Sequence, residues 1–452
     1  MLKNGFLLST ERAKALYDSV KALPIIDYHN HLSLADVSQN RRFLDVYDLW
    51  IAPDPYKHRA MRMVGVEEYY ITGGATKEEK FVKWCETIGK LSMHPLSHWS
   101  YMELERVFGV TEKIDGANAK KLYAYCNQYL QEKEVTVDSL LSFFNVEYAC
   151  PCASLVDELA LFGEDKRLAP SLRGDDIVAV TESFVQKLEG LTGIKIDGLS
   201  AFERAVSLRL DAFKNRGCTY SDHALDNGFV FYEDDGKNAE RFTSALQGNI
   251  TAADKQRLAS YLLVFLGKEY AKRGFVMQLH IGAERYTSSK LRKAAGAAGG
   301  FAGIGNSVDA RSLTQFLDAV DCTEYGLPKT LLFTLNPADN ALVSVLSGSY
   351  SKDGVAGLVT QGPAWWWCDH KQGLVEMLEY ITSYSILSNF VGMTTDSRSF
   401  LSFVRHDYFR RILCNWVAEK AECGDFPDDM QELKTLVYKL CYQNAKDNFG
   451  GI

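Results

Sequence analysis

From residue 146 onward, the chain alternates short apolar runs with longer segments whose apolar residues recur at helical spacing. Strands that alternate with amphipathic helices indicate βα units and a parallel sheet. The pattern predicts strands at residues 146–150, 167–170, 275–280, 330–335, 357–359 and 390–394, and helices at residues 201–216, 252–273, 312–320 and 374–387.

The first 145 residues follow a different pattern. Thr10 and an apolar stripe after it predict a first helix, which Pro24 ends, and residues 24–31 predict a buried strand with a polar end. Residues 36–145 show helical patterns, with no linker-like composition at either border. We therefore divide the chain into a helix with the first strand (1–35), a mostly helical insertion (36–145) and the rest of the barrel with C-terminal helices (146–452). The predicted helices of the insertion cover residues 77–88, 99–108 and 117–132.

A parallel sheet of this kind is either doubly wound or closed into a barrel, and two features favour the barrel. Polar, chemically useful residues stand at the C-terminal ends of several predicted strands, as they do in barrel enzymes. No glycine-rich phosphate-binding turn follows the first predicted strand. The sequence therefore predicts an α/β protein with a distorted (β/α)8 barrel of the TIM type and a helical insertion after the first strand.

The composition argues against some classes of partner. The 452 residues are 46% hydrophobic and carry a net charge of −8, which indicates a packed globular protein without the basic surface that nucleic acid requires. No stretch reaches the roughly 18 apolar residues of a membrane span, so we expect no membrane partner. Ten cysteines without a CxxC pair suit reduced thiols in the cytoplasm. Large barrels often self-associate, so we expect a homo-oligomer.

The strongest local signal is the HxH motif of His29 and His31 at the end of the first predicted strand. Strand side chains alternate between faces, so both imidazoles point the same way and suit a divalent transition metal. Two hydrogen-bonded polar histidines are the alternative interpretation. His280 and Asp396 follow two other apolar runs and can complete a metal site, in which Asp396 serves as a ligand or a base. Arg398 can hold a substrate carboxylate in bidentate geometry.

Other conspicuous residues have plainer interpretations. Cys150 and Cys152 are interpreted as packed thiols, because no second cysteine pair accompanies them. Asp222 and His223 either support the site from another strand end or serve the structure alone. Surface or capping positions are predicted for His94, His98, His370 and His406, and a solvated or subunit-contact helix face for Arg405, Arg410 and Arg411.

Six blocks of sequence carry a family resemblance, namely residues 29–31, 54–62, 221–226, 278–283, 395–400 and 405–411. In their order and content they resemble uronate isomerases, a sugar-acid branch of the amidohydrolase superfamily. The resemblance runs from about residue 5 to residue 449. It implies a barrel of the metal-dependent hydrolase type and an aldose-ketose isomerase that interconverts D-glucuronate with D-fructuronate, and D-galacturonate with D-tagaturonate.

The resemblance also implies roles for the residues of the site. His29, His31 and Asp396 match the ligands of one divalent metal, usually zinc, and His280 lies in or beside that shell. Tyr56 matches a tyrosine placed for proton transfer, so that Tyr56, Asp396 and His280 form the catalytic set. Moving a carbonyl from C1 to C2 requires such groups, because a proton must leave C2 and another must reach C1.

Substrate binding is implied for four further residues. Arg173 and Arg398 match arginines that hold the substrate, which a sugar carboxylate explains. Trp365 and Trp366 match a paired-tryptophan segment that lines the pocket. The small-molecule partner is then a hexuronate, and no nucleotide cofactor is expected.

The chain also departs from the family pattern. Residues 150–155 read Cys-Pro-Cys-Ala-Ser-Leu where relatives commonly have Thr-Thr-Asp-Asp-Pro, and Pro55 replaces a histidine. Residues 364–369 read Ala-Trp-Trp-Trp-Cys-Asp where Gly-Trp-Trp-Phe-Asn-Asp is usual. Two alternatives therefore stay open: a metal-dependent amidohydrolase or lactonase on the same barrel, and a catalytically lapsed protein that binds a sugar acid.

Overall fold

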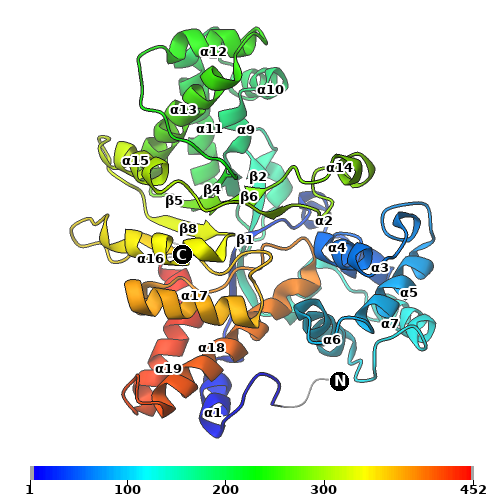
Figure 1. The fold of residues 1–452 in the computed structure, drawn as a ribbon. Coiled ribbons are helices and arrows are strands. Elements are labelled where there is room, and N and C mark those ends of the chain that lie inside the picture. The colour runs from blue at the N-terminus through cyan, green and yellow to red at the C-terminus, as the bar shows by residue number, and fades with distance from the viewer. Residues whose placement is uncertain (1–4, 449–452) are drawn as a thin grey trace.

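A curled sheet of seven parallel strands lies at the centre of the molecule (Figure 1). The structure is a computed structural model and describes residues 5–448. The strands lie in the spatial order β1-β2-β3-β4-β5-β8-β9, while β6 and β7 form a separate antiparallel ribbon. The strands of both sheets are β1 (Ile25–Asn30), β2 (Val146–Ser154), β3 (Ser171–Arg173), β4 (Tyr220–Leu225), β5 (Val276–Ile281), β6 (Ala283–Glu284), β7 (Gly303–Ile304), β8 (Thr330–Thr334) and β9 (Val359–Gln361).

Between β1 and β2 the chain forms helices and no named strand. Local sequence explains where they begin. Thr76 and Glu79 form a capping box at the start of one helix, and Pro95 takes the first position of the next, where a missing N–H is tolerated. These helices are α2 (Leu34–Ser38), α3 (Val46–Trp50), α4 (Pro55–Met63), α5 (Lys77–Ile88), α6 (Pro95–Phe108), α7 (Ala119–Glu132) and α8 (Val137–Phe143).

The other helices surround the sheet. In Figure 1, α10–α13 lie above it, the helices α3–α7 lie to its right, and α1 lies below it with α18 and α19. In the described part of the chain, no helix combines the length and apolar character that a bilayer crossing needs. These helices are α1 (Glu11–Val20), α9 (Asp175–Ala179), α10 (Glu182–Thr192), α11 (Leu199–Asn215), α12 (Asn238–Leu246), α13 (Ala252–Arg273), α14 (Ser289–Ala295), α15 (Ala310–Asp321), α16 (Asn340–Val345), α17 (Lys371–Tyr384), α18 (Val404–Glu422), α19 (Met430–Tyr438) and α20 (Asn444–Asp447).

Short turns of other helix types connect these elements. A π-helical turn, η7 (Lys439–Gln443), joins α19 to α20. The 3-10 turns are η1 (Glu68–Tyr70), η2 (Leu159–Phe162), η3 (Pro337–Asp339), η4 (Leu346–Gly348), η5 (Leu387–Asn389) and η6 (Phe400–Phe403).

Two large hydrophobic clusters hold the elements together. One contains Trp50 and Trp84 from the helices after β1, together with Leu413 of α18, so this region packs directly against the C-terminal helices. The other contains Leu279 of β5 and Leu262 of α13, which join the sheet to its outer helices. Burial of these side chains gives the main favourable contribution to folding. The division of the chain at residues 35 and 145 stays a prediction.

The predicted strand at residues 390–394 is not a strand in the structure. Left-handed backbone at Gly392 (φ 86°) and Asp396 (φ 47°) interrupts the extended conformation. The segment still runs beside β1, where the N–H of Asp396 donates to the carbonyl of His29 at 3.1 Å. The predicted distorted (β/α)8 barrel is therefore confirmed, with an irregular segment in the place of the eighth strand.

Three other strand predictions need correction. Residues 167–170 contact β2 only through an isolated bridge at Leu168, and β3 begins after Pro170, which has no N–H to donate. Gly357 has a left-handed φ of 60°, and β9 begins only at Val359. Strand β4 is not among the predicted strands, because its sequence Tyr-Ser-Asp-His-Ala-Leu lacks an apolar run.

Helix α18 is buried nearly all round, so the prediction that Arg405, Arg410 and Arg411 form a solvated or subunit-contact face is wrong for Arg405 and Arg410, while Arg411 is partly exposed. Arg405 and Arg410 are 2% and 4% exposed. Arg410 donates to backbone carbonyls at the end of α1 and the start of β1, with distances of 2.9 Å to Leu23 and 2.8 Å to Pro24. His406 is also buried, at 4% exposure, rather than at the surface. His94 and His370 are helix caps, as predicted.

The carboxylate of Asp27 joins β1 to the irregular segment that closes the barrel. It accepts hydrogen bonds from Thr394 Oγ1 at 2.9 Å, from the backbone N–H of Thr395 at 2.6 Å and from Thr395 Oγ1 at 2.7 Å. Asn30 Nδ2 at 3.0 Å and His406 Nε2 at 3.2 Å complete its surroundings. Burial would raise the pKa of Asp27, but these partners outweigh burial and lower that pKa.

We expect Asp27→Ala to reduce the free energy of unfolding by about 3–5 kcal/mol, because it leaves several buried donors without an acceptor. Chemical denaturation followed by circular dichroism measures this change. Asp18→Ala is the matched control, since Asp18 makes only an exposed ion pair with Lys21 and its removal should leave the midpoint unchanged. Equal midpoints for the two variants would show that Asp27 does not hold the barrel closed.

Candidate active site

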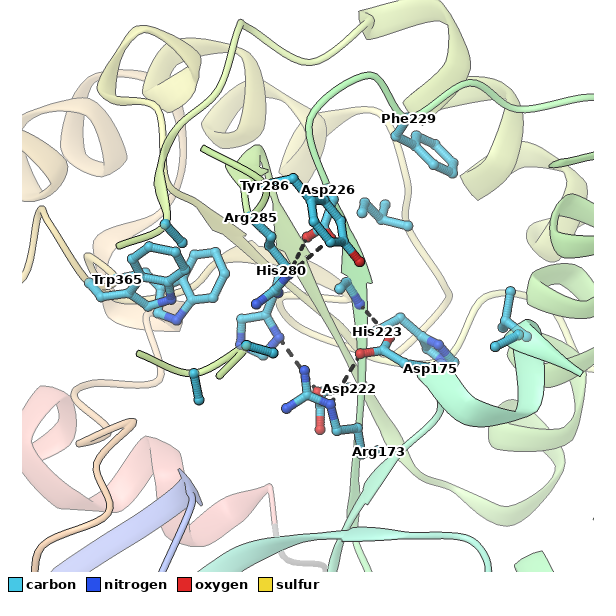
Figure 2. Close-up of a pocket in the computed structure, with 18 of the residues that line it drawn as sticks. Arg173, Asp175, Asp222, His223, Asp226, Phe229, His280, Arg285, Tyr286 and Trp365 are labelled. Atoms are coloured by element: carbon cyan, nitrogen blue, oxygen red, sulfur yellow. Dashed lines mark hydrogen bonds and ion pairs between the residues drawn. The ribbon is translucent and has the colours of Figure 1, made fainter. Parts of the chain in front are cut away.

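A cavity of about 820 Å³ lies where the chain leaves the strands β1, β3, β4 and β5. Its volume lies within the range of small-ligand sites, and this end of a parallel barrel is where barrel enzymes carry their active sites. Figure 2 shows side chains from β3, β4 and β5 converging on it. The cavity is lined by every residue that the sequence predicts for the site: His29, His31, Tyr56, Arg173, His280, Trp365, Trp366, Asp396 and Arg398.

A cluster of metal-type donors lies at the end of β1. Asp396 Oδ1 is 3.3 Å from His29 Nε2 and 3.1 Å from His31 Nε2. Cys152 of β2 approaches the same ring from its other nitrogen, with the sulfur 3.6 Å from His29 Nδ1. Donor atoms of His29, His31 and Cys152 all lie within 4.8 Å of one another. Asp396 therefore faces the Nε2 atoms of both imidazoles, while Cys152 faces Nδ1 of His29.

His280 and Asp222 lie beside each other (Figure 2) and next to this cluster. The His280 ring is 4.6 Å from the His29 ring, and its Nδ1 is 3.8 Å from Asp222 Oδ2. Its Nε2 is buried and has no hydrogen-bond partner among the described residues. His223 instead contacts Tyr270 Oη through its Nε2 at 2.8 Å. Of the pair on β4, Asp222 therefore supports the donor cluster, while His223 contacts the helix behind it.

Burial and neighbouring charges set the ionisation of these groups. Burial would raise the pKa of Asp396, but His29 and His31 outweigh it and hold that pKa well below its usual value. Burial likewise opposes ionisation of Cys152, and the same two imidazoles hold the pKa of its thiol well below the usual value. The pKa of His280 is held well below its usual value by burial and by His29. Two negative groups therefore surround the imidazole pair, beside a neutral third imidazole.

This donor set fits a divalent transition metal. Imidazole nitrogen, carboxylate oxygen and thiolate sulfur are the ligand types of zinc and similar ions. The buried Nε2 of His280, which has no partner in the described part of the chain, is the kind of atom that an ion or a bound substrate satisfies.

Asp396 is fixed by its backbone and by a tryptophan. Its φ of 47° lies in the left-handed region, where non-glycine residues are strained, and such strain is often found at functional sites. Trp365 Nε1 donates to Asp396 Oδ2 at 2.7 Å, and the Trp365 ring packs 4.7 Å from the ring of His280. Trp366 packs edge-on against Trp365 at 4.9 Å. Trp365 therefore orients a catalytic candidate as well as lining the cavity.

Tyr56 lies in the first turn of α4 in front of a buried ion cluster. Asp54 caps this helix and Pro55 takes its first position, which proline occupies without strain, so the departure at Pro55 is compatible with the helix. Lys57 Nζ binds Asp54 at 2.7 Å and Glu103 at 3.3 Å behind the tyrosine. Tyr56 Oη is buried and has no hydrogen-bond partner within residues 5–448.

Two guanidinium groups lie over the ring of Tyr56. The Cζ of Arg59 is 4.8 Å and that of Arg405 is 4.9 Å from the ring centroid. Burial raises the pKa of Tyr56 well above its usual value, and Asp369 and Asp396 act in the same direction. The two arginines oppose this shift, so the phenol is the resting form and a transient phenolate has cations beside it.

The arginines of the cavity fall into two groups. Arg173 Nε pairs with Asp175 at 3.1 Å, and Arg285 Nε pairs with Asp226 at 2.8 Å (Figure 2). Arg398 lines the cavity and forms no hydrogen bond or ion pair with a described residue. Arg59 also lines the cavity and stacks 3.6 Å from the Trp367 ring. It forms no ion pair with a described residue, although the charges of Asp369 and Asp54 interact with its guanidinium group. These two unpaired cations are suited to bind an anion.

Sequence reasoning missed Arg59 and Cys152 as site residues. Cys150 is packed in an apolar cluster inside the barrel, as predicted, whereas Cys152 lies among polar groups. Cys152 stands near the end of a strand, where site residues of a barrel gather, and this position could have identified it. The lack of a second cysteine pair alone led to its interpretation as a packed thiol. Arg59 stands within the resemblance block at residues 54–62, three positions after Tyr56 along a helix.

The fold and this site define a barrel enzyme of the amidohydrolase superfamily. The sequence model of the glucuronate isomerase family matches residues 1–449. The chain belongs to this family, and the prediction of an aldose-ketose isomerase is confirmed at that level.

Known proteins of the same kind align over nearly the whole chain. Uronate isomerases of Mannheimia succiniciproducens and Bacillus licheniformis are both 37% identical to it, over 99% of this chain and over 99% and 97% of theirs. The crystal structure of uronate isomerase from Thermotoga maritima superposes with a TM-score of 0.92 at 30% identity, covering 99% of each chain. A glucuronate isomerase structure from Caulobacter crescentus, with a TM-score of 0.91 at 23% identity, shares the fold.

We expect Trp365→Phe to lower turnover about 10–100-fold, the usual cost of removing a hydrogen bond that orients a ligand or a catalytic group. The substitution keeps the aromatic surface and removes only the donor to Asp396 Oδ2. Steady-state kinetics with D-glucuronate measure the effect. Trp366→Phe is the matched control, because Trp366 lines the same cavity without a hydrogen bond to Asp396. Equal kinetics of the two variants would contradict this role of Trp365.

Proposed function

We propose that this chain interconverts D-glucuronate with D-fructuronate, and D-galacturonate with D-tagaturonate, by metal-assisted proton transfer between C2 and C1. One observation carries the proposal: a single cavity contains both the donor cluster around His29 and His31 and the two unpaired guanidinium groups of Arg59 and Arg398. A hexuronate needs both, because it carries a reactive carbonyl and hydroxyl pair and a carboxylate.

The substrate carboxylate is assigned to Arg398, with Arg59 as the second cation. A guanidinium binds a carboxylate through two parallel hydrogen bonds, and Arg398 has no competing acid in the described chain. Arg173 is oriented by Asp175 and is assigned to the sugar hydroxyls. Trp366 supplies apolar surface for a sugar face.

The metal is assigned to His29, His31 and Asp396, and zinc is the ion that these ligand types favour. When bound, such an ion polarises the oxygens at C1 and C2 and so stabilises the negative charge of an enediolate. His280 stays neutral at physiological pH, because its pKa is held below the usual value, and its free Nε2 can accept a hydrogen bond or a proton from a substrate hydroxyl.

Proton movements follow from the ionisation of Asp396 and Tyr56. Asp396 stays ionised, so it can take a hydroxyl proton and open the sugar ring. Isomerisation then removes one proton from C2 and returns one to C1, while a second proton passes from the oxygen at C2 to the oxygen at C1. Tyr56 is assigned to the proton that moves from C2 to C1. Once its phenol has lost its proton to solvent, the phenolate, beside which Arg59 and Arg405 lie, takes the proton from C2 and returns the same proton to C1.

Incubation of zinc-loaded protein with D-glucuronate, and separately with D-galacturonate, should form a ketose in both cases. A coupled reductase follows ketose formation, and elemental analysis should count one ion per chain. Two tightly bound ions with hydrolysis of lactones would favour the hydrolase alternative. Absence of ketose from both sugars, with the metal site filled, would contradict the proposal and favour the catalytically lapsed binding protein.

Arg398→Met should raise KM for D-glucuronate about tenfold or more, because a hydrogen bond between charged groups contributes about 1.5–3 kcal/mol. Arg292→Met is the matched control, since Arg292 lines the same cavity but stacks on Tyr286 at 4.2 Å. Initial-rate kinetics over a range of substrate concentrations give both constants. An unchanged KM in Arg398→Met would move the carboxylate to another cation of the cavity.

A further inference from the structure

The surroundings of Cys152 differ from those of every buried thiol that packs in a core. Strand β2 directs Cys150 and Cys152 to the same side, because strand residues two positions apart share a face. Cys150 comes earlier along the strand, in an apolar cluster inside the barrel with Tyr28 and Tyr220. Cys152 lies near the C-terminal end of the strand, where its sulfur contacts His29 Nδ1 and also Asp222 Oδ1, each at 3.6 Å. Its neighbours are therefore polar groups that bind metals.

The spacing of the donor atoms matches the separation of ligands around one ion. Zinc bonds of about 2.3 Å to sulfur and about 2.0–2.1 Å to nitrogen, at a tetrahedral angle, place the two ligand atoms about 3.6 Å apart. The sulfur of Cys152 is 3.6 Å from a nitrogen of His29, and donor atoms of His29, His31 and Cys152 lie within 4.8 Å of one another. These distances fit three ligands around one ion, and a thiol–imidazole hydrogen bond gives the same distance between sulfur and nitrogen.

A second observation points to a ligand at the same place. His280 is 3% exposed, its ring lies 4.6 Å from the His29 ring, and its Nε2 has no partner among the described residues. Polar atoms that are buried in this way are satisfied by an ion, water or substrate. The cluster around Cys152 is thus incomplete without a bound group.

We propose that Cys152 is a sulfur ligand of the active-site ion, together with His29 and His31. The sulfur faces Nδ1 of His29 and Asp396 faces Nε2 of the same ring, and one imidazole gives only one nitrogen to an ion. In this ligand set Cys152 therefore takes the place assigned to Asp396 above, and the Asp396 carboxylate serves as a base. This inference rests on the proposed metal site of the isomerase. It makes the site selective for ions that bind thiolate, such as zinc, cobalt and cadmium, over manganese and magnesium.

The test uses the full chain, freed of metal with a chelator and titrated with cobalt(II). A cobalt-thiolate bond gives an intense charge-transfer absorption in the near ultraviolet, which nitrogen and oxygen ligands do not give. We expect this band in the wild type and in Cys150→Ala, and its loss in both Cys152→Ser and Cys152→Ala. Cys150→Ala is the matched control, because it removes a buried thiol from the same face of the same strand.

Competition with a coloured chelator then measures affinity. Cys152→Ser should bind cadmium(II) at least tenfold more weakly than the wild type, whereas its affinity for manganese(II) should change by less than about threefold. Thermal unfolding of each metal-free variant shows whether it is folded. A wild-type protein without the band, or a band that survives in Cys152→Ser, would overturn the proposal.

Failure of this proposal is distinguishable from failure of the proposed function. Ketose formation by a cobalt-loaded wild type that lacks the band would leave the isomerase reaction in place and remove Cys152 from the ligand set. A cobalt-thiolate band in a protein that forms no ketose would establish the sulfur ligand and contradict the isomerase reaction.

Discussion

The structure depends on the attachment of an irregular segment, residues 391–397, to β1. A regular eighth strand would close the barrel with backbone hydrogen bonds alone. Here the carboxylate of Asp27 accepts hydrogen bonds from Thr394 and Thr395, and the backbone of Asp396 bonds to His29. The same contacts bring Asp396 to within 3.3 Å of the two imidazoles. Barrel closure and assembly of the donor cluster are therefore one event.

The chemistry of the site follows from charges that are held apart from water. Asp396 and Cys152 are both stabilised as anions by the imidazole pair, while His280 is held neutral. Burial lowers the pKa of His29 and of His31, but Cys152 and Asp396 outweigh burial and raise both pKa values, so the anions and the imidazoles stabilise each other. Tyr56, in contrast to these anions, is a neutral phenol, and two guanidinium groups lie over its ring. One cavity thus contains an ionised carboxylate and a neutral phenol, whose surroundings move their pKa values in opposite directions.

Support for Tyr56 comes from parts of the chain far apart in sequence. Arg405 of α18 contacts Asp369 at 3.6 Å and lies 4.2 Å from the ring of Trp99, while Lys57 and Glu103 pair behind the tyrosine. The helices after β1 and the C-terminal helices share one hydrophobic cluster. The helices after β1 thus place Tyr56 and Arg59 at the cavity.

The sequence by itself determined the alternation of strands and helices and the HxH motif, because period and strand ends are local properties. The nine predicted site residues line one cavity, and their roles stay predictions. The sequence predicted a regular strand at residues 390–394, where the backbone is irregular, and it did not predict β4. An apolar run marks a buried strand only where the barrel interior is apolar, and β4 carries polar side chains instead. Only the tertiary structure decided that Arg405 is buried and that Cys152 lies beside His29. Those facts depend on which neighbours a side chain meets, and segments more than a hundred residues apart supply them.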